Sequence, residues 1–423
     1  MRYAFLFLII ITFSYQNVSG QRNDNVINAI KLGDSLQFKD AIGLLKKEIK
    51  INPNNADAFY WLGRFSHYLV YDSRPFDNKG DDWSKNQVLY NFIKATKLNP
   101  NYGDAYYFIA VEYGSRARES IQNNNIQQAK KELLNAKKIG AFPNYILEYA
   151  RNILRTCDKN AILFTNQDPA VNALMYVQLI EGYRKDISVV CVNLLERPFY
   201  IKYMRDGIPN EITKVPISWN NNIIMNMYNY FPWKSQNISI KISAKQKRLY
   251  NLPDSTKEIK MLVKDKWENT MWIGTAAILN LIEKNEFERP IYCAMPYQDD
   301  MFEFTDFLKN EGFVSKFMPY KVKGSENEYD NAKIESSLLN ENCYKDFSDI
   351  IIHSQPRPNY FFVDNKRNLI LNYVEFLLIS NNSKDALRVY SKMNILMPEN
   401  IAPLSKELVE RCKKIEIKLN KNN

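Results

Sequence analysis

The pattern of apolar and polar positions between Asn160 and Leu195 predicts a strand, a loop, a helix and a second strand. Ala161–Phe164 is a short apolar run, which Thr165–Pro169 interrupts. From Ala170 to Tyr183 the apolar residues recur at helical spacing, and Ile187–Leu195 is a nearly unbroken, β-branched apolar run. Such a run is typical of a strand that is covered on both faces. The order indicates a βαβ unit, in which the strands are parallel and the crossover is right-handed.

The residues before this unit carry the spacing of a helical repeat. Ala41 precedes Pro53 by twelve residues, and Val88 precedes Pro100 by the same interval. Small residues let paired helices approach closely, and each proline ends the second helix of a pair. This pattern resembles that of tetratricopeptide repeats, whose period is about 34 residues. The step from Pro53 to Pro100 is 47 residues, which predicts an inserted loop around residues 71–84. The residues expected to pack the repeats are Ala41, Pro53, Leu62, Gly63, Ala95, Pro100, Ala105, Tyr106, Ala110, Ala129 and Ala136.

Beyond Leu195 the apolar pattern predicts further helices and strands, and then a helical C-terminal region. We therefore predict a multidomain chain, with all-α tetratricopeptide helical repeats at 21–157, a central α/β domain with a mostly parallel sheet at 158–323, and a C-terminal helical, repeat-like region at 324–423. The expected helices are Arg197–Asp206, Ile223–Tyr230, Thr270–Ile282, Asp299–Glu311, Asn368–Ile379 and Lys384–Met397, the last pair with Ala386, Tyr390 and Met393 facing inward. The expected strands are Ser239–Ser243, Glu258–Val263, Ile291–Ala294 and Ser315–Val322.

The first twenty residues predict export. Arg2 supplies a short positive region, Ala4–Phe13 is a ten-residue apolar run, and Val18-Ser19-Gly20 provides small residues for cleavage before Gln21. These are the parts of a signal peptide, at residues 1–20. A membrane-spanning helix needs roughly twenty apolar residues, twice the length of this run. We expect a protein of the periplasm or cell surface that does not span the membrane after cleavage.

Composition narrows the range of partners, metals and cofactors that the protein is expected to bind. The formal charge is +10, which would suit nucleic acid, anionic lipid or acidic glycan. The basic clusters are not interleaved with aromatic residues in any recognition motif, so we expect no nucleic acid partner. The chain has five cysteines and two histidines, without the spacing of a metal site or of a histidine-based triad. We expect no metal and no cofactor.

Several residues of the central region also occur at corresponding places in one bacterial family. The chain carries Thr165, Asn166 and Asp168 after the first strand, the run Gln178-x-x-Glu181-Gly182-Tyr183-Arg184, and Arg289-Pro290-Ile291-Tyr292. In these positions it resembles the soluble C-terminal region of Bacteroidetes-type protein O-mannosyltransferase-like membrane proteins, over about Asn160–Pro398. The family's glycine before the aspartate is Gln167 here, and Pro169-Ala170 replaces its acidic pair. Without the membrane-embedded part that would transfer the sugar, the resemblance implies a stand-alone accessory module and not a transferase.

A candidate ligand cleft lies where the parallel strands end. Ligands of open α/β sheets bind beyond the carboxyl ends of the strands. The first strand leads to Thr165, Asn166 and Asp168, the second to Arg197, and the strand at 291–294 to Asp299 and Asp300. A carboxylate pair there would bind sugar hydroxyls or act as acid and base. The simpler interpretation is that Asp168 and one of the later aspartates cap the helices that follow them, and that Glu181 and Arg184 form a surface pair.

Three hypotheses about function follow. The favoured one is an exported, non-enzymatic interaction protein, which binds a protein partner through the repeat surface and serves envelope glycosylation or surface assembly. The alternatives are a glycan-active enzyme that uses Asp168 with Asp299 or Asp300, and a glycan-binding module that uses the same cleft.

Overall fold

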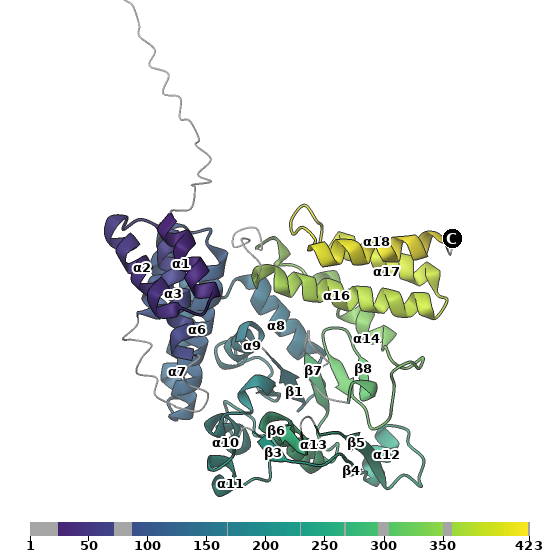
Figure 1. Cartoon of the computed structure of the whole chain (residues 1–423). Coiled ribbons are helices and arrows are strands. Elements are labelled where there is room, and N and C mark those ends of the chain that lie inside the picture. The colour runs from purple at the N-terminus through teal and green to yellow at the C-terminus, as the bar shows by residue number, and fades with distance from the viewer. Residues whose placement is uncertain are drawn as a thin grey trace, which may run out of the picture.

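The computed structural model of the chain describes residues 24–71, 87–166, 168–228, 230–265, 268–294, 304–349 and 358–421. The predicted signal peptide and most of the predicted inserted loop lie outside these residues, as do Asp299 and Asp300. Figure 1 shows a helical N-terminal part, a central part that contains the sheet, and a group of C-terminal helices. This arrangement confirms the predicted order of helical, α/β and helical regions.

The N-terminal part is built from helices that pack on their neighbours in sequence. α3 contacts α1, α2 and α5, while α6 contacts α5 and α7. The ends of α2 and α5 lie just before Asn52-Pro53 and Asn99-Pro100, where the prolines were expected to stop the helices. The bounds are α1 Asp24–Asp34, α2 Phe38–Ile51, α3 Ala56–Tyr71, α5 Val88–Leu98, α6 Gly103–Gln122, α7 Ile126–Ile139 and α8 Asn144–Thr156.

The residues expected to pack the repeats lie mostly at helix–helix contacts. All of them are buried except Tyr106, which is half-buried, and Pro53 and Pro100, which are exposed just beyond the helix ends. Gly63 illustrates why small residues are needed, since a Cβ atom there would lie 2.9 Å from the ring of Phe92. Close approach of α3 and α5 therefore depends on the missing side chain.

The central part contains a five-stranded mixed sheet in the order β2-β1-β7-β9-β8. β1 pairs in parallel with both β2 and β7, and α9 (Asp168–Leu179) connects β1 to β2. This confirms the predicted βαβ unit. β9 is antiparallel to both β7 and β8, so only the β2-β1-β7 half of the sheet is parallel. The strands are β1 Ile162–Thr165, β2 Ser188–Cys191, β7 Ile291–Ala294, β8 Leu308–Asn310 and β9 Ser315–Phe317.

Two short antiparallel pairs lie beside this sheet. β4 (Gln236–Lys241) pairs with β5 (Glu258–Val263). The strand expected at 258–263 is confirmed, whereas the strand expected at 239–243 starts and ends earlier. β3 (Tyr230–Pro232) pairs with β6 (Thr270–Trp272), and neither strand was predicted. The other helices here are α10 Pro198–Asp206, α11 Asn221–Met225, α12 Ala244–Leu249 and α13 Ile273–Asn285.

Several local predictions were wrong, and long-range pairing explains most of them. The strand expected at 315–322 ends at Phe317. The second strand ends at Cys191, because Val192–Leu194 turns into a 3₁₀ helix. The end of the helix expected at 299–311 is a strand instead, because Leu308–Asn310 pairs with β9. The helix expected from Thr270 begins only at Ile273, after β6. The helix expected at 223–230 starts earlier and ends at Met225, since the Asn220 side chain caps it and Tyr230 joins β3.

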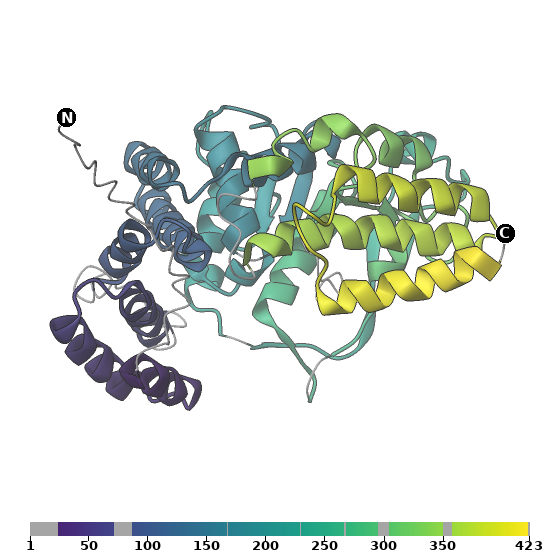
Figure 2. The ribbon, with the colours of Figure 1, turned by 90° about the horizontal axis from the view of Figure 1, so that it is seen from above.

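The C-terminal part is a group of three helices, α16 Pro358–Ile379, α17 Ser383–Leu396 and α18 Lys406–Lys421, preceded by α14 Asn331–Ser336. Figure 2 shows α16, α17 and α18 side by side, in yellow-green and yellow. The predicted pair at 368–397 is confirmed, and Ala386, Tyr390 and Met393 are buried as expected. Buried Arg367 donates to the carbonyls of Met397 and Ala402, which joins α16 to the segment after α17.

Apolar packing runs through all three parts. One core joins α3 to α8, the sheet face that carries Leu163 and Tyr292, and the C-terminal helices. A second core covers the other face, with Ile162 and Phe164 of β1 packed against α13. Alternate residues of β1 thus face different cores, as expected for a strand that is buried on both sides. Among the residues that the structure describes, no helix is long and apolar enough to cross a membrane.

Candidate functional site

The carboxyl end of β1 carries buried polar atoms without partners. Thr165 pairs with Cys191 of β2 on one side of β1 and with Ala294 of β7 on the other side. β1 therefore has a parallel neighbour on each side at this edge. Thr165 is fully buried and Asn166 is 3% exposed. Within the described part of the chain, Thr165 Oγ1 and Asn166 Oδ1 accept or donate no hydrogen bond. Buried polar atoms nearly always form hydrogen bonds. A polar ligand or a water molecule is therefore expected to bind these two oxygens at this edge.

Arg197 lies at the same end of the sheet, just before α10. Its Nε atom is buried and, among the described residues, has no hydrogen-bond partner. Glu196 beside it has a raised pKa, chiefly because burial disfavours its charged form. Three of the residues predicted for the ligand cleft, Thr165, Asn166 and Arg197, therefore each have a buried polar atom without a hydrogen-bond partner among the described residues.

Asp168 differs from Thr165, Asn166 and Arg197, because its carboxylate has a partner. It binds an arginine from the N-terminal helices. Arg118 Nη2 of α6 lies 2.9 Å from Asp168 Oδ1 and 3.0 Å from Ser115 Oγ. Arg118 also donates to Asn172 Oδ1, and the amide nitrogen of Asn172 donates to the carbonyl of Ala110 across 3.1 Å. The guanidinium is buried, whereas the Asp168 side chain is 39% exposed. The start of α9 is thus fastened to α6, a link that the sequence analysis missed.

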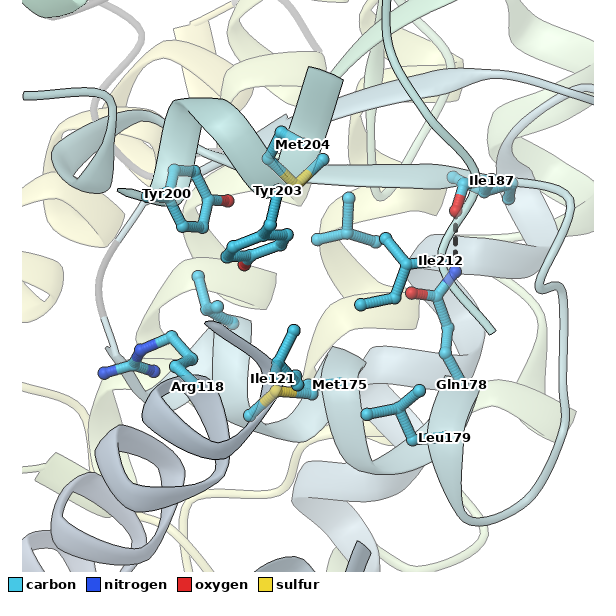
Figure 3. Close-up of a pocket in the computed structure, with 12 residues that line it drawn as sticks. Arg118, Ile121, Met175, Gln178, Leu179, Ile187, Tyr200, Tyr203, Met204 and Ile212 are labelled. Carbon is cyan, nitrogen blue, oxygen red and sulfur yellow. Dashed lines mark hydrogen bonds between the residues drawn. The ribbon is translucent and has the colours of Figure 1, made fainter. Parts of the chain in front are cut away.

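A cavity of about 50 Å³, which Arg118 helps to line, lies between α6, α9 and α10. Figure 3 shows Arg118 and Gln178 on opposite sides of it, with mostly apolar side chains between them. Gln178 already donates to the carbonyls of Arg184 and Ile187, and the Tyr200 hydroxyl accepts from the amide of Cys191. The cavity has room for a few water molecules and is too small for a sugar.

A second group of polar and aromatic side chains lies on α3 and α6. The Arg64 guanidinium is 4.9 Å from the ring centroid of Trp61 and 5.6 Å from that of Tyr68. Its nitrogens donate to the hydroxyls of Tyr68 and Tyr60 at 3.3 and 3.4 Å. The Tyr60 hydroxyl in turn donates to Asp104 Oδ2 of α6 across 3.2 Å. In the part of the chain that the structure describes, Arg64 forms no ion pair with a carboxylate.

Tyr107 is affected by the charges of Asp104 in this group and of Asp168 at the start of α9. Burial raises the pKa of Tyr107 above its ordinary value, and the charges of Asp168 and Asp104 add to that effect. The side chain therefore lies within electrostatic reach of both carboxylates. We call the set Tyr60, Trp61, Arg64, Tyr68, Asp104 and Tyr107 the inner-helix cluster. A signal for it was present in the sequence, since Tyr60, Arg64 and Tyr68 recur every four residues and so share one helix face.

Arg184 and Arg289, which belong to the motifs quoted for the family resemblance, bind backbone carbonyls instead of lining the site. Arg184 donates to the carbonyls of Leu154, Cys157 and Asp158, at 2.8 to 3.0 Å. Arg289 donates to the carbonyls of Asn160, Ala161 and Lys214, and to Ser188 Oγ. Both arginines thus brace the segments that lead into β1 and β2. Each guanidinium binds several carbonyl groups at once, an arrangement that we call a clamp. The planar fork of guanidinium N–H donors can form it, and a lysine ammonium cannot.

The predicted surface pair of Glu181 and Arg184 was wrong. Glu181 accepts both hydrogen bonds of Arg151 in α8, at 2.7 and 2.8 Å, whereas Arg184 pairs with Asp186. The helix has already ended, because Gly182 and Arg184 both adopt positive φ values, +68° and +51°. The turn points the two side chains to different partners.

The structure bears on the predicted carboxylate pair and on metal binding only through the described residues. Asp299 and Asp300 lie outside them, so a carboxylate pair with Asp168 stays a prediction. Where the structure describes the chain, His, Cys, Asp and Glu side chains form no group that could hold a metal ion. The five cysteines are buried and free.

The central segment also matches a known family model. That model, TMEM260-associated domain 2, matches residues 146–226 and 221–338. The segment is similar to TMEM260-associated domain 2. The match spans α8 to α14, including the clamps formed by Arg184 and Arg289, and it fits the resemblance to O-mannosyltransferase-related proteins. The helices α1 to α7 and α16 to α18 lie outside the TMEM260-associated domain 2 match. Comparison with curated proteins and with solved structures gave no match.

Proposed function

We propose that the protein is an exported, non-enzymatic interaction protein whose N-terminal helices are tetratricopeptide repeats that bind a protein segment. The observation that carries this proposal is the inner-helix cluster. Its guanidinium, Arg64, is held by two aromatic rings and two hydroxyls. Within the described residues Arg64 forms no direct ion pair, and the Asp104 carboxylate is linked to it through the Tyr60 hydroxyl. The similarity to TMEM260-associated domain 2 supports an accessory role in envelope glycosylation or surface assembly.

The cluster suits a carboxylate of a partner segment. A guanidinium fork forms strong, charge-assisted hydrogen bonds with carboxylates, and Arg64 is already positioned by its contacts. Trp61 and Tyr68 are half-buried, so each has surface left for an apolar side chain beside that carboxylate. Aromatic and arginine side chains together are also the residues that dominate binding at protein interfaces. The proposed ligand is therefore an extended peptide with an acidic group next to an apolar residue.

Selection of random peptides on the intact protein tests this proposal. Enriched peptides should carry a carboxylate, and their affinity should fall at least about ten-fold for Arg64→Gln, as expected for one lost charge-assisted contact. The control is Arg388→Gln, because Arg388 is a half-exposed surface arginine of α17. Peptides that bind wild type and Arg64→Gln equally, or a selection that enriches no acidic peptide, would overturn the proposal.

A second candidate function is glycan binding at the sheet edge. The unsatisfied atoms of Thr165, Asn166 and Arg197 offer both donors and acceptors, which suits sugar hydroxyls. Catalysis by Asp168 is less favoured, because Arg118 binds its carboxylate. A glycan array probed with wild type and with Asn166→Leu tests this candidate. Loss of one defined glycan signal in the variant supports it, and an array without a signal for wild type removes it.

A further inference from the structure

One end of the molecule exposes an unusual number of large apolar side chains. Within nine residues, Ile223, Met225, Tyr228, Tyr230 and Phe231 are 45%, 44%, 82%, 49% and 37% exposed. They lie on α11, on β3 and on the segment between them. Single exposed apolar residues are common on protein surfaces, but a contiguous set marks an interaction site.

Basic side chains continue this surface. The segment 219–265 contains eight Lys or Arg residues against three Asp or Glu residues, so it holds half of the net charge of the chain. Seven of these eight cations are exposed, namely Lys234, Lys241, Lys245, Arg248, Lys257, Lys260 and Lys264. In the two-stranded β4–β5 sheet, Ile238, Ile240, Met261 and Val263 face the core, which leaves Lys241, Lys260 and Leu262 on the outer face.

The aromatic and basic parts form one surface. Trp219 stacks on Phe231 with ring centroids 6.3 Å apart, and the Trp233 indole donates to the carbonyl of Val263 in β5. α13 contacts both β3 and β4 from the core side. Figure 1 shows α11, β3, β4, β5 and α12 along the lower edge of the molecule, at the opposite end from α16 to α18. We call this surface, formed by the exposed residues of 219–264 named above, the basic aromatic face.

We propose that the basic aromatic face docks the protein on an anionic lipid surface. Tyrosine and tryptophan side chains are enriched at the boundary between lipid and water, where their rings are partly buried. Lysine and arginine are attracted to anionic headgroups, and reversible membrane attachment generally needs an apolar and an electrostatic contribution together. A protein partner fits less well, since lysine is depleted in protein–protein interfaces and this face is rich in it.

Vesicle co-sedimentation of the full chain tests the proposal. Binding should be at least about ten-fold stronger to phosphatidylcholine vesicles that contain roughly a third of phosphatidylglycerol than to pure phosphatidylcholine. Lys234→Glu with Lys257→Glu should remove most of that difference. Lys413→Glu with Lys414→Glu changes the net charge equally on exposed positions of α18, at the opposite end, and should leave binding within about two-fold of wild type.

The apolar contribution is tested separately. Met225→Ser with Tyr228→Ser should weaken binding most at high salt, where electrostatic attraction is screened. An unchanged melting temperature for each variant shows that the fold is retained, as expected for exposed positions. Equal binding to both kinds of vesicle, equal losses in the two charge variants, or no vesicle binding would overturn the proposal. Retention on heparin without vesicle binding would assign the face to an acidic polymer and would overturn it as well.

Discussion

Arg118 of α6 and Asp168 at the start of α9 form an ion pair, with 2.9 Å between Nη2 and Oδ1. The two residues are fifty positions apart and belong to the N-terminal helices and to the α/β unit, respectively. Arg118 is buried, so removal of the Asp168 carboxylate would take a charged partner from a buried guanidinium. The pair therefore fixes the first helix of the central region against the helical array, next to the candidate ligand edge.

Asp168→Asn should lower the free energy of unfolding by about 1–3 kcal/mol, because a buried guanidinium loses its charged partner. Arg118 keeps its hydrogen bonds to Ser115 and Asn172, which limits the loss. Urea denaturation measures the effect. The matched control is Asp206→Asn, which removes a 42% exposed carboxylate from Lys202 and Arg205 and should cost at most about 1 kcal/mol. An equal effect of the two substitutions would contradict the structural role of Asp168.

Gly114 makes the same α6–α9 contact possible. A Cβ atom at this position would lie 2.2 Å from the side chain of Asn172, whose amide binds both Arg118 and the Ala110 carbonyl. Gly114→Ala should therefore destabilise the protein by about 1–3 kcal/mol, despite the better helix propensity of alanine.

Gly43→Ala is the control for Gly114→Ala. Gly43 lies inside α2, and a Cβ atom there would meet nothing within 4 Å. The substitution should raise the free energy of unfolding by about 0.5–1 kcal/mol, because only helix propensity changes. Thermal unfolding monitored by circular dichroism compares the two variants. Opposite signs are expected, and two stabilising changes would show that α6 and α9 are not tightly packed.

The sequence was sufficient to predict the elements that depend on local pattern. The βαβ unit, the strands β4 and β5 and the α16–α17 pair each rest on a periodicity within a short segment. Strands β3, β6 and β8 were missed, because each of these short strands is defined by a partner and not by its own pattern. β9 was expected at 315–322 and is present at Ser315–Phe317. The same reason limits the site. Thr165, Asn166 and Arg197 follow from strand ends, whereas nothing near Arg118 in the sequence points to Asp168.

Arg289→Lys tests whether the motif residues of the central region are structural. Arg289 makes four hydrogen bonds, at 2.7 to 2.9 Å, to three carbonyls and to Ser188 Oγ. An ammonium keeps the charge but cannot reproduce this fork, so a loss of about 1–3 kcal/mol is expected. Arg388→Lys on the surface of α17 should change stability by less than about 0.5 kcal/mol. Unfolding by guanidinium chloride distinguishes the two, and a neutral Arg289→Lys would contradict the clamp.

Asp158 predicts a specific pH dependence of stability. Burial on its own would raise the pKa of this carboxyl, but the hydrogen bond and charge of Lys316, together with Tyr292 and Lys333, lower it to about 2. Since the ordinary value is about 3.9, the ionised form stabilises the folded state above that pH, and the contribution disappears as the pH falls toward 2. The difference in unfolding free energy between wild type and Asp158→Asn should be constant near neutral pH and shrink between about pH 4 and pH 2. Urea titrations at fixed pH values measure this difference. Asp254→Asn, at an exposed carboxylate, should leave the shape of the profile unchanged, and a pH-independent difference for Asp158→Asn would show that its ion pair with Lys316 does not stabilise the fold.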